Sequence, residues 1–212
     1  MRKEYWRTLD LQLKEETSMS ANNQIIRTLM QVIEVKDRYT AGHSNRVAEY
    51  TVKIARELGY NEMMLERFYS CAMIHDIGKT KIPDSILNKT GMLTTEEYEV
   101  MKKHTDYGYE ILKGITYMPE LALAALYHHE RADGQGYHKI PLLRIPRIAQ
   151  VISVADAFDA MNSDRPYRSR LQFDNIINII KNESGKQFVP DVVVAFLNLA
   201  ERGELLPPSD IL

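Results

Sequence analysis

Apolar residues recur at every third or fourth position through most of the chain, which is the spacing of an amphipathic helix. No segment shows the strict alternation of apolar and polar residues that marks a half-buried strand. The pattern therefore predicts an all-α protein. The helices that it indicates cover residues 22–36, 43–58, 61–75, 94–112, 119–129, 148–162, 173–182 and 191–201.

Residues suited to helix ends support several of these boundaries. Asn61 stands where an N-cap is expected, and Gly59 suits the end of the preceding helix. Thr94 followed by Glu97 has the spacing of a capping box. The segment 131–146, RADGQGYHKIPLLRIP, is too rich in Gly and Pro for a helix. We expect it to be a long shaped loop between two core helices, and such loops are usually functional.

The first 20 residues differ from the rest of the chain. They are strongly charged, and a short apolar stripe of Trp6, Leu9 and Leu13 ends after two turns. We interpret 1–20 as a helical linker or extension and 21–212 as one domain. Two alternatives remain open for the linker: it follows an upstream sensor domain, or it is a simple extension. A homodimer could also form through this helix.

The composition is that of a soluble globular protein, with 44% hydrophobic and 26% charged residues. No apolar run approaches the roughly 18 residues that a membrane span needs. The N-terminus lacks the apolar stretch of a signal peptide, so we expect a cytoplasmic protein without membrane insertion. A net charge of −2 argues against duplex nucleic acid as a partner. The single cysteine, Cys71, excludes an internal disulfide and a thiolate-rich metal site.

Histidines and aspartates gather at the predicted helix ends. His75-Asp76 ends one apolar helix and His128-His129 ends another. A buried carboxylate is costly unless it is paired or binds a metal. Adjacent helical residues point about 100° apart, so a pair reaches one ion only at a helix end or where helices converge. Two such pairs indicate one shared site. Capping histidines are the simpler interpretation, but they explain one pair and not both.

Two further aspartates lie in the apolar segment 148–162. Asp156 should face the core if the stripe is interpreted correctly. For Asp159, one turn later, two readings stay open: it is the exposed member of the pair, or it orients a histidine ligand. Imidazoles and carboxylates without sulfur suit iron, manganese or a similar divalent ion. Two such ions about 3.5–4 Å apart favour hydrolysis of a phosphoester.

Two other segments resemble known motifs but lack residues that those motifs require. Gly78-Lys79-Thr80 is not a phosphate-binding loop, because Met73 occupies the place of its first glycine and no strand precedes it. His129-Glu130 is not a metalloprotease motif, because Asp133 stands where the second histidine is required.

Four segments resemble, in order and spacing, the HD-GYP subgroup of the HD phosphohydrolases. They are KDRYTAGHSNRV (36–47), IHDIGKTKIPDSILNKTGMLTTEE (74–97), HHERADGQGY (128–137) and VADAFDAMNSDRPYR (154–168). The resemblance covers about residues 22–200 and implies the helical bundle of HD domains. Its implied activity is metal-dependent hydrolysis of cyclic di-GMP to linear pGpG, or onward to GMP, by a metal-bridged hydroxide.

The resemblance also assigns roles to individual residues. It implies that one metal is held by His43, His75, Asp76 and Asp156, and that Asp76 bridges to a second metal held by His104, His128 and His129. Lys79 is implied to meet the scissile phosphate, Tyr137 to stand near the substrate, and Arg165 and Arg168 to grip phosphate oxygens. Without the resemblance, the two arginines would be taken as solvated surface charges.

Two departures from the family pattern change the expectations. Tyr39 replaces a glutamate that accompanies a third metal in some members, so we predict two metals rather than three. The motif ends in Gly136-Tyr137-His138 instead of GYP. We favour His138 as an incidental loop residue over a substrate contact. The altered motif keeps two alternatives open: another cyclic dinucleotide or nucleotide as substrate, and a signalling module that binds without catalysis.

Overall fold

The computed structural model describes residues 26, 28, 42–164 and 169–205. The predicted helix 22–36, apart from 26 and 28, and the segment 1–20 lie outside the described residues, as do Tyr39, Arg165 and Arg168. The described α-helices are α2 (His43–Glu57), α3 (Glu62–Ile74), α4 (Asp84–Leu87), α5 (Thr95–Lys102), α6 (His104–Leu112), α7 (Glu120–Tyr127), α8 (Arg147–Asn162), α9 (Phe173–Asn182) and α10 (Pro190–Glu201). Two 3₁₀ helices, η1 (Ile77–Lys81) and η2 (Leu142–Arg144), complete the described elements.

The all-α prediction is confirmed. Within the described ranges the only β-type pairing is an isolated bridge between Ser184 and Phe188. None of the helices there combines the length and the apolar character needed to cross a lipid bilayer.

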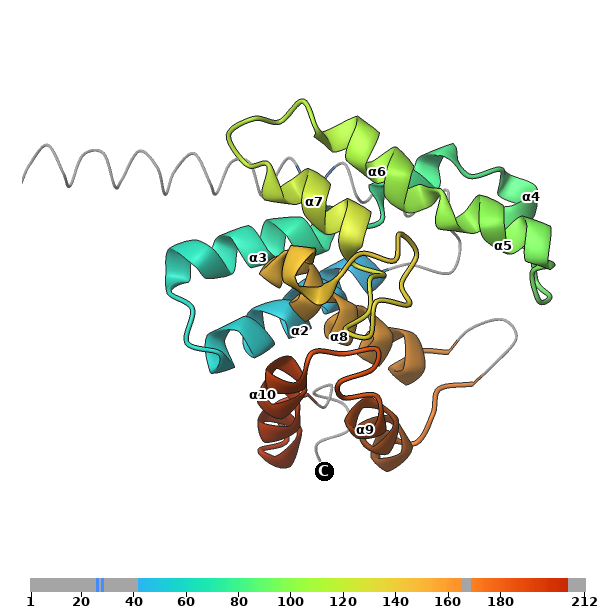
Figure 1. Ribbon diagram of the computed structural model, residues 1–212. Helices are drawn as coiled ribbons and strands as arrows, with labels where there is room; N and C mark the ends of the chain where they lie inside the picture. Colours follow the sequence, from blue (N-terminus) through green and yellow to red (C-terminus); the bar gives the residue numbers. More distant parts are fainter. Residues whose placement is uncertain (1–25, 27, 29–41, 165–168, 206–212) are drawn as a thin grey trace, which may run out of the picture.

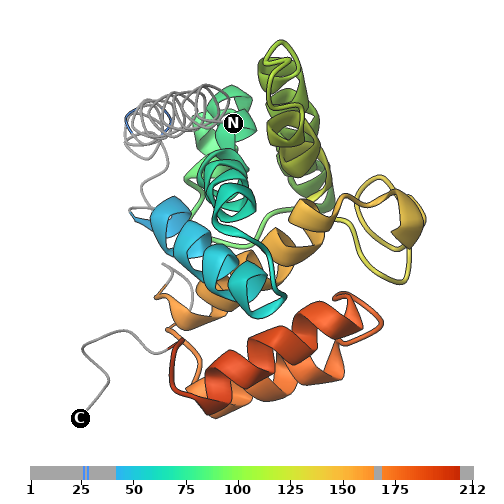
Figure 2. The ribbon, with the colours of Figure 1, turned by 90° about the vertical axis from the view of Figure 1, so that its left-hand side faces the viewer.

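Helix α8 is the central element of the bundle (Figure 1). It packs against α2, α7, α9 and α10, and its buried side chains include Val151, Ile152 and Phe158. Helices α2 and α3 lie side by side on one part of α8, and α9 and α10 lie side by side on another (Figure 2). Helices α6 and α7 pair with each other, and α7 also contacts α3. Burial of these apolar faces, at roughly 25 cal/mol per Å², is the main source of stability.

The predicted capping residues are found in their expected roles. The Asn61 side chain accepts a hydrogen bond from Met64 N at 3.0 Å. Thr94 and Glu97 exchange both hydrogen bonds of a capping box. Gly59 follows the end of α2 with φ of 86°, in the left-handed region that favours glycine. Each cap satisfies backbone groups that a helix end leaves open.

The prediction of one helix over 94–112 is wrong, because the chain forms two helices there. Helix α5 ends at Lys102 and α6 begins at His104. His104 Nδ1 lies 2.8 Å from the carbonyl of Met101, and Thr105 Oγ1 donates to the carbonyl of Lys102 at 3.0 Å. The side chains of His104 and Thr105 thus occupy backbone carbonyls that would accept amide hydrogen bonds in an unbroken helix. The short elements η1, α4 and η2 were not anticipated from the sequence.

Gly78 allows η1 to pack directly on the backbone of α6. A Cβ at this position would lie 1.8 Å from the carbonyl oxygen of His104 and 2.5 Å from Gly108 N. Both neighbours are backbone atoms, which cannot turn aside as a side chain can. The glycine therefore sets the distance between the segment that carries His75-Asp76 and the helix that carries His104.

We expect Gly78→Ala to destabilise the fold by about 3 kcal/mol, because the added methyl forces η1 away from α6. Urea unfolding, compared through its midpoint and slope, measures the change. Gly114→Ala is the matched control, since nothing lies within 4 Å of a Cβ there. Equal midpoints for the two variants would show that the contact between η1 and α6 is not tight.

Candidate metal centre and adjoining cavity

Seven side chains from five separate parts of the bundle meet at one point. His43 begins α2, His104 begins α6, and Asp156 lies inside α8. His75-Asp76 follows α3 and His128-His129 follows α7, so that both pairs sit at helix ends. The spatial convergence expected from the sequence is therefore present. Of this set, His43, His75, Asp76, His104 and His128 are buried, and His129 and Asp156 are partly buried.

Asp76 lies at the centre of the cluster, between two groups of histidines. Its Oδ2 lies 3.4 Å from His75 Nε2 and 3.8 Å from His43 Nε2. Its other oxygen, Oδ1, lies 3.3 Å from His104 Nε2 and 3.7 Å from His128 Nε2. The two oxygens thus face two different groups of imidazoles. This is the placement expected of a carboxylate that joins two neighbouring cation sites.

The backbone fixes how three of the rings point. The Nδ1 atom of His75 lies 2.6 Å from the carbonyl of Ala72, and that of His104 lies 2.8 Å from Met101 O. His128 Nδ1 lies 3.0 Å from Ala125 O. Because a carbonyl only accepts, each Nδ1 carries the proton, and in the neutral ring the Nε2 lone pair points toward Asp76.

Asp159 orients His43. Its Oδ2 lies 2.7 Å from His43 Nδ1, while its Oδ1 accepts from Arg46 Nε at 2.6 Å. Asp159 is buried, which excludes the reading in which it was the exposed aspartate. His43 Nε2 then faces Asp156 Oδ1 at 3.3 Å. A carboxylate behind a ligating imidazole holds its orientation and raises its basicity.

The charge states follow from burial and from these neighbours. Burial works to raise the pKa of Asp76, but Lys79 and the surrounding histidines hold it well below the usual range. Burial lowers the pKa of His104 to about 3 and also lowers the pKa of His128 and of His129. Burial opposes protonation of His43 as well, yet its hydrogen bonds to Asp156 and Asp159 raise the pKa to about 9.

Two buried atoms of the cluster, His75 Nε2 and Asp76 Oδ1, have no hydrogen-bond partner within the described part of the chain. Asp76 Oδ1 and the Nε2 lone pairs of His104 and His128 lie close together, with the two nitrogens 3.3 Å apart. Converging acceptors repel one another unless a cation lies between them. Candidate ligand atoms of His43, His75 and Asp76, and of His104, His128 and His129, all lie within 4.8 Å inside each group. This donor set fits divalent metal ions.

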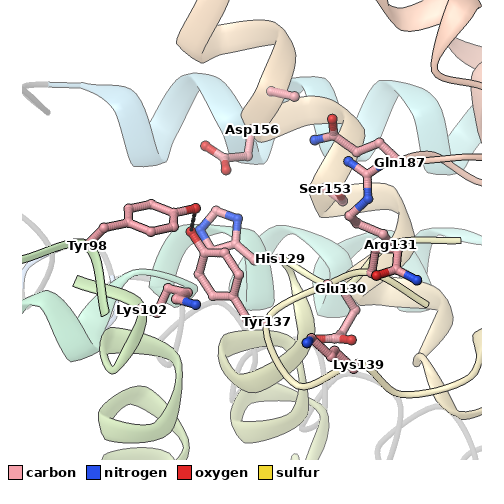
Figure 3. A pocket seen from close by; sticks show the side chains of 13 residues that line it. Tyr98, Lys102, His129, Glu130, Arg131, Tyr137, Lys139, Ser153, Asp156 and Gln187 are labelled. Carbon is pink, nitrogen blue, oxygen red and sulfur yellow. Dashed lines mark hydrogen bonds between the residues drawn. The ribbon is translucent and has the colours of Figure 1, made fainter. Parts of the chain in front are cut away.

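A cavity of about 670 Å³ opens beside this centre. Figure 3 shows His129 and Asp156 in its middle, with Tyr98 and Lys102 on one side and Arg131, Lys139 and Gln187 on the other. Tyr137 stands next to His129, their ring centres 4.7 Å apart, and receives a hydrogen bond from Tyr98 Oη at 3.2 Å. Lys102 lies over the rings of both tyrosines. A cavity of this size accommodates a ligand of several hundred daltons.

The loop 131–146 is tied to the metal centre through Glu130. This buried carboxylate accepts from His138 N at 2.6 Å and from Ile140 N at 3.1 Å. Gly136 packs against it so closely that a Cβ there would lie 2.6 Å from Glu130 Cα. Glu130, the residue after His129, therefore shapes the loop, and no motif in the sequence indicated this role.

His138 points away from the cavity that Tyr137 and Lys139 line. Its Nε2 lies 3.1 Å from Thr105 Oγ1, and its ring meets Tyr127 edge to face. His138, which stands in the place of the motif's proline, thus contacts α6 and α7 and does not line the cavity.

We expect Glu130→Ala to loosen the loop, because two partly buried amides lose their acceptor at a cost of about 1 kcal/mol each. Hydrogen exchange followed by mass spectrometry should show faster exchange over residues 136–142. Glu130→Gln retains one acceptor oxygen and should fall between the wild type and the alanine variant. Unchanged protection in Glu130→Ala would mean that other contacts hold the loop.

Comparisons with known proteins agree with this geometry. A family model described as HD domain matches residues 27–192. A Thermotoga maritima protein named cyclic di-GMP phosphodiesterase is 41% identical over 180 residues, which cover 83% of this chain and 49% of that protein. The cyclic di-GMP phosphodiesterase response regulator RpfG of Xanthomonas campestris is 36% identical over 198 residues, covering 90% of this chain and 52% of RpfG.

One solved structure is similar to this chain in both sequence and fold. The Vibrio cholerae protein V-cGAP3, described as a cyclic GMP-AMP-specific phosphodiesterase, superimposes with a TM-score of 0.55 at 31% identity, covering 87% of this chain and 41% of that one. The chain therefore belongs to the HD domain family, and within it to the HD-GYP subgroup that its motifs predicted. It spans about half the length of the curated relatives it matches.

Proposed function

We propose that this chain is a phosphodiesterase that hydrolyses cyclic di-GMP to linear pGpG. The observation that carries the proposal is the cluster of imidazoles around Asp76, open to a cavity large enough for a dinucleotide. The similarity to proteins named cyclic di-GMP phosphodiesterases, at 41% and 36% identity, supports the same substrate. Further hydrolysis to GMP needs the same chemistry on the second phosphodiester.

Two divalent metal ions, iron or manganese, complete the proposed site. His43, His75, Asp76 and Asp156 would hold one, and Asp76 would share the other with His104, His128 and His129. The division follows the two oxygens of Asp76, each of which faces its own group of imidazoles. Bound there, the ions act as Lewis acids toward phosphate and make water nucleophilic at neutral pH.

Lys79 and Tyr137 are the proposed contacts of the reacting nucleotide. Lys79 Nζ lies 2.6 Å from Asp76 Oδ2, beside the cluster, where an ammonium group can meet a phosphate oxygen and stabilise its developing negative charge. Tyr137 lines the cavity next to His129. Arg165 and Arg168 are proposed to bind further phosphate oxygens, as forked donors do.

The reaction adds one water across a phosphorus–oxygen bond of the ring. The oxygen of the water bonds to phosphorus, the bond to the ribose 3′ oxygen breaks, and one proton ends on that leaving oxygen. Of the seven clustered side chains, His129 and Asp156 are the two that line the cavity, and they are the most open to a bound substrate. The products are a 5′-phosphate and a free 3′-hydroxyl on one linear dinucleotide.

A second candidate substrate is another cyclic dinucleotide, with cyclic GMP-AMP foremost. The similarity to V-cGAP3 favours it. We further propose that the reaction takes place in the cytoplasm and that residues 1–20 connect the domain to an upstream sensor or pair two copies.

Elemental analysis of anaerobically purified protein tests the metal site. We expect about two metal ions per chain, and we expect Asp76→Ala to lose both, because each ion would lose its shared ligand. Asp174→Ala, on the exposed face of α9, is the control and should retain both. A wild-type content near three, or full metal content in Asp76→Ala, contradicts the two-metal arrangement.

Turnover by the same metal-loaded sample tests the reaction. Cyclic di-GMP, cyclic GMP-AMP and cyclic di-AMP are supplied separately, and products are separated by chromatography. We expect cyclic di-GMP to be cleaved fastest, and we expect Lys79→Met to lower the rate on every substrate about 100-fold while keeping its metal. Faster cleavage of cyclic GMP-AMP favours the second candidate. Binding without cleavage at full metal content identifies a non-catalytic module.

A further inference from the structure

Tyr98 lines the cavity beside the metal centre, although no motif of the sequence gives it a role. It belongs to α5, a helix that contributes none of the seven clustered side chains. The residue is 45% exposed, yet its hydroxyl points toward Tyr137 and His129 (Figure 3). There it donates to Tyr137 Oη at 3.2 Å, and the two tyrosine rings meet edge to face with their centres 6.2 Å apart.

Tyr137 is held at both ends of its side chain. At the backbone end, the next amide, His138 N, donates to the buried carboxylate of Glu130 at 2.6 Å. At the far end, the ring lies beside His129, with the ring centres 4.7 Å apart, and the hydroxyl meets Tyr98. A side chain that is fixed at its root and at its tip presents its hydroxyl at one place.

Lys102 contacts both tyrosine rings at once. It is the last residue of α5, one turn after Tyr98. Its ammonium group lies 5.4 Å from the centre of the Tyr98 ring and 5.7 Å from the centre of the Tyr137 ring. The quadrupole of an aromatic ring attracts a cation over its face, so one ammonium group draws both rings toward itself. Helix α5 therefore holds the tip of Tyr137 through a hydrogen bond and through a shared cation.

The two hydroxyl groups carry two protons and share one hydrogen bond. A phenol is neutral near pH 7, so each oxygen offers one proton and also accepts. One of the two protons lies between the oxygens, and the other has no acceptor within the described part of the chain. Because Tyr98 donates, the remaining proton belongs to Tyr137, the member of the pair that lies against His129. The pair thus leaves one hydrogen-bond donor at the edge of the histidine cluster.

We propose that Tyr98 is a positioning residue, which through its hydrogen bond to Tyr137 directs the Tyr137 hydroxyl toward a phosphate oxygen at the metal centre. This inference rests on the proposed function and deepens the account of the same site. A hydroxyl that donates to a phosphate oxygen stabilises the negative charge that develops there during the reaction. Donation from Tyr98 also makes Tyr137 the stronger donor, because hydrogen bonds in a chain polarise one another.

A double-mutant cycle of phenylalanine variants tests this inference, because phenylalanine removes the hydroxyl and retains the ring. The substrates are cyclic di-GMP and bis(p-nitrophenyl) phosphate, a phosphodiester without a base. We expect Tyr98→Phe to lower kcat about 5-fold on both substrates, the effect of one neutral hydrogen bond, with KM and metal content unchanged. Tyr137→Phe should lower kcat further, since it removes the donor itself. In the Tyr137→Phe background, Tyr98→Phe should have no additional effect.

Tyr117→Phe is the matched control and should leave kcat unchanged on both substrates. It removes the same hydroxyl from a residue that is 62% exposed and does not line the cavity. The metal content of every variant is measured beside its rate, which separates a positioning role from a structural one.

Four results would overturn the inference while the proposed function stands. They are an unchanged rate in Tyr98→Phe, equal losses in both backgrounds of the cycle, a loss of bound metal, and a loss confined to cyclic di-GMP, which would assign Tyr98 to a base. Wild-type protein that cleaves only bis(p-nitrophenyl) phosphate would refute the proposed substrate, and the cycle on that diester would still decide the inference. Metal-loaded wild type that cleaves neither diester would refute the proposed function and the inference together.

Discussion

The burial of the Asp76 carboxylate among imidazoles is the constraint on which the rest of this structure depends. A carboxylate removed from water is costly unless opposite charge compensates it. Lys79 supplies one positive charge at 2.6 Å, but it meets only Oδ2. Oδ1 faces the ring nitrogens of His104 and His128, whose low pKa values keep them neutral. The geometry of the cluster therefore fits bound cations, which would meet Oδ1 and the neutral ring nitrogens.

Four helices contribute residues at or next to their ends to this centre, α8 contributes Asp156 from its interior, and the loop 131–146 contributes part of the cavity wall beside it. Helix ends are held by the packed core, so ligand positions inherit the rigidity of the bundle. The loop takes its shape from Glu130, whose neighbour His129 belongs to the cluster. One short segment, from His128 to Ile140, thus connects the histidine cluster to the wall of the cavity.

The sequence predicted the helices and the convergence of the histidines well, because both depend on patterns local to each helix. His75-Asp76 and His128-His129 could be placed at helix ends from apolar periodicity alone. The break at Lys103 could not, since it depends on side chains of His104 and Thr105 taking helix carbonyls. The Asp159 side chain had two readings until α2 was placed against α8. Gln187 joins the cavity only through the fold of a distant turn, which leaves no local signal.

The histidine and aspartate cluster and the wall of the cavity differ in how much a substitution would disturb them. A change of metal ligand acts on Asp76 and thus on the charge balance of the whole cluster. A change at Lys139 acts on one exposed side chain whose backbone is held by Glu130 and not by its own contacts. Substitution there alters the chemistry of the cavity wall without disturbing the core. The wall of the cavity can therefore change at small cost in stability, whereas the cluster around Asp76 tolerates little change.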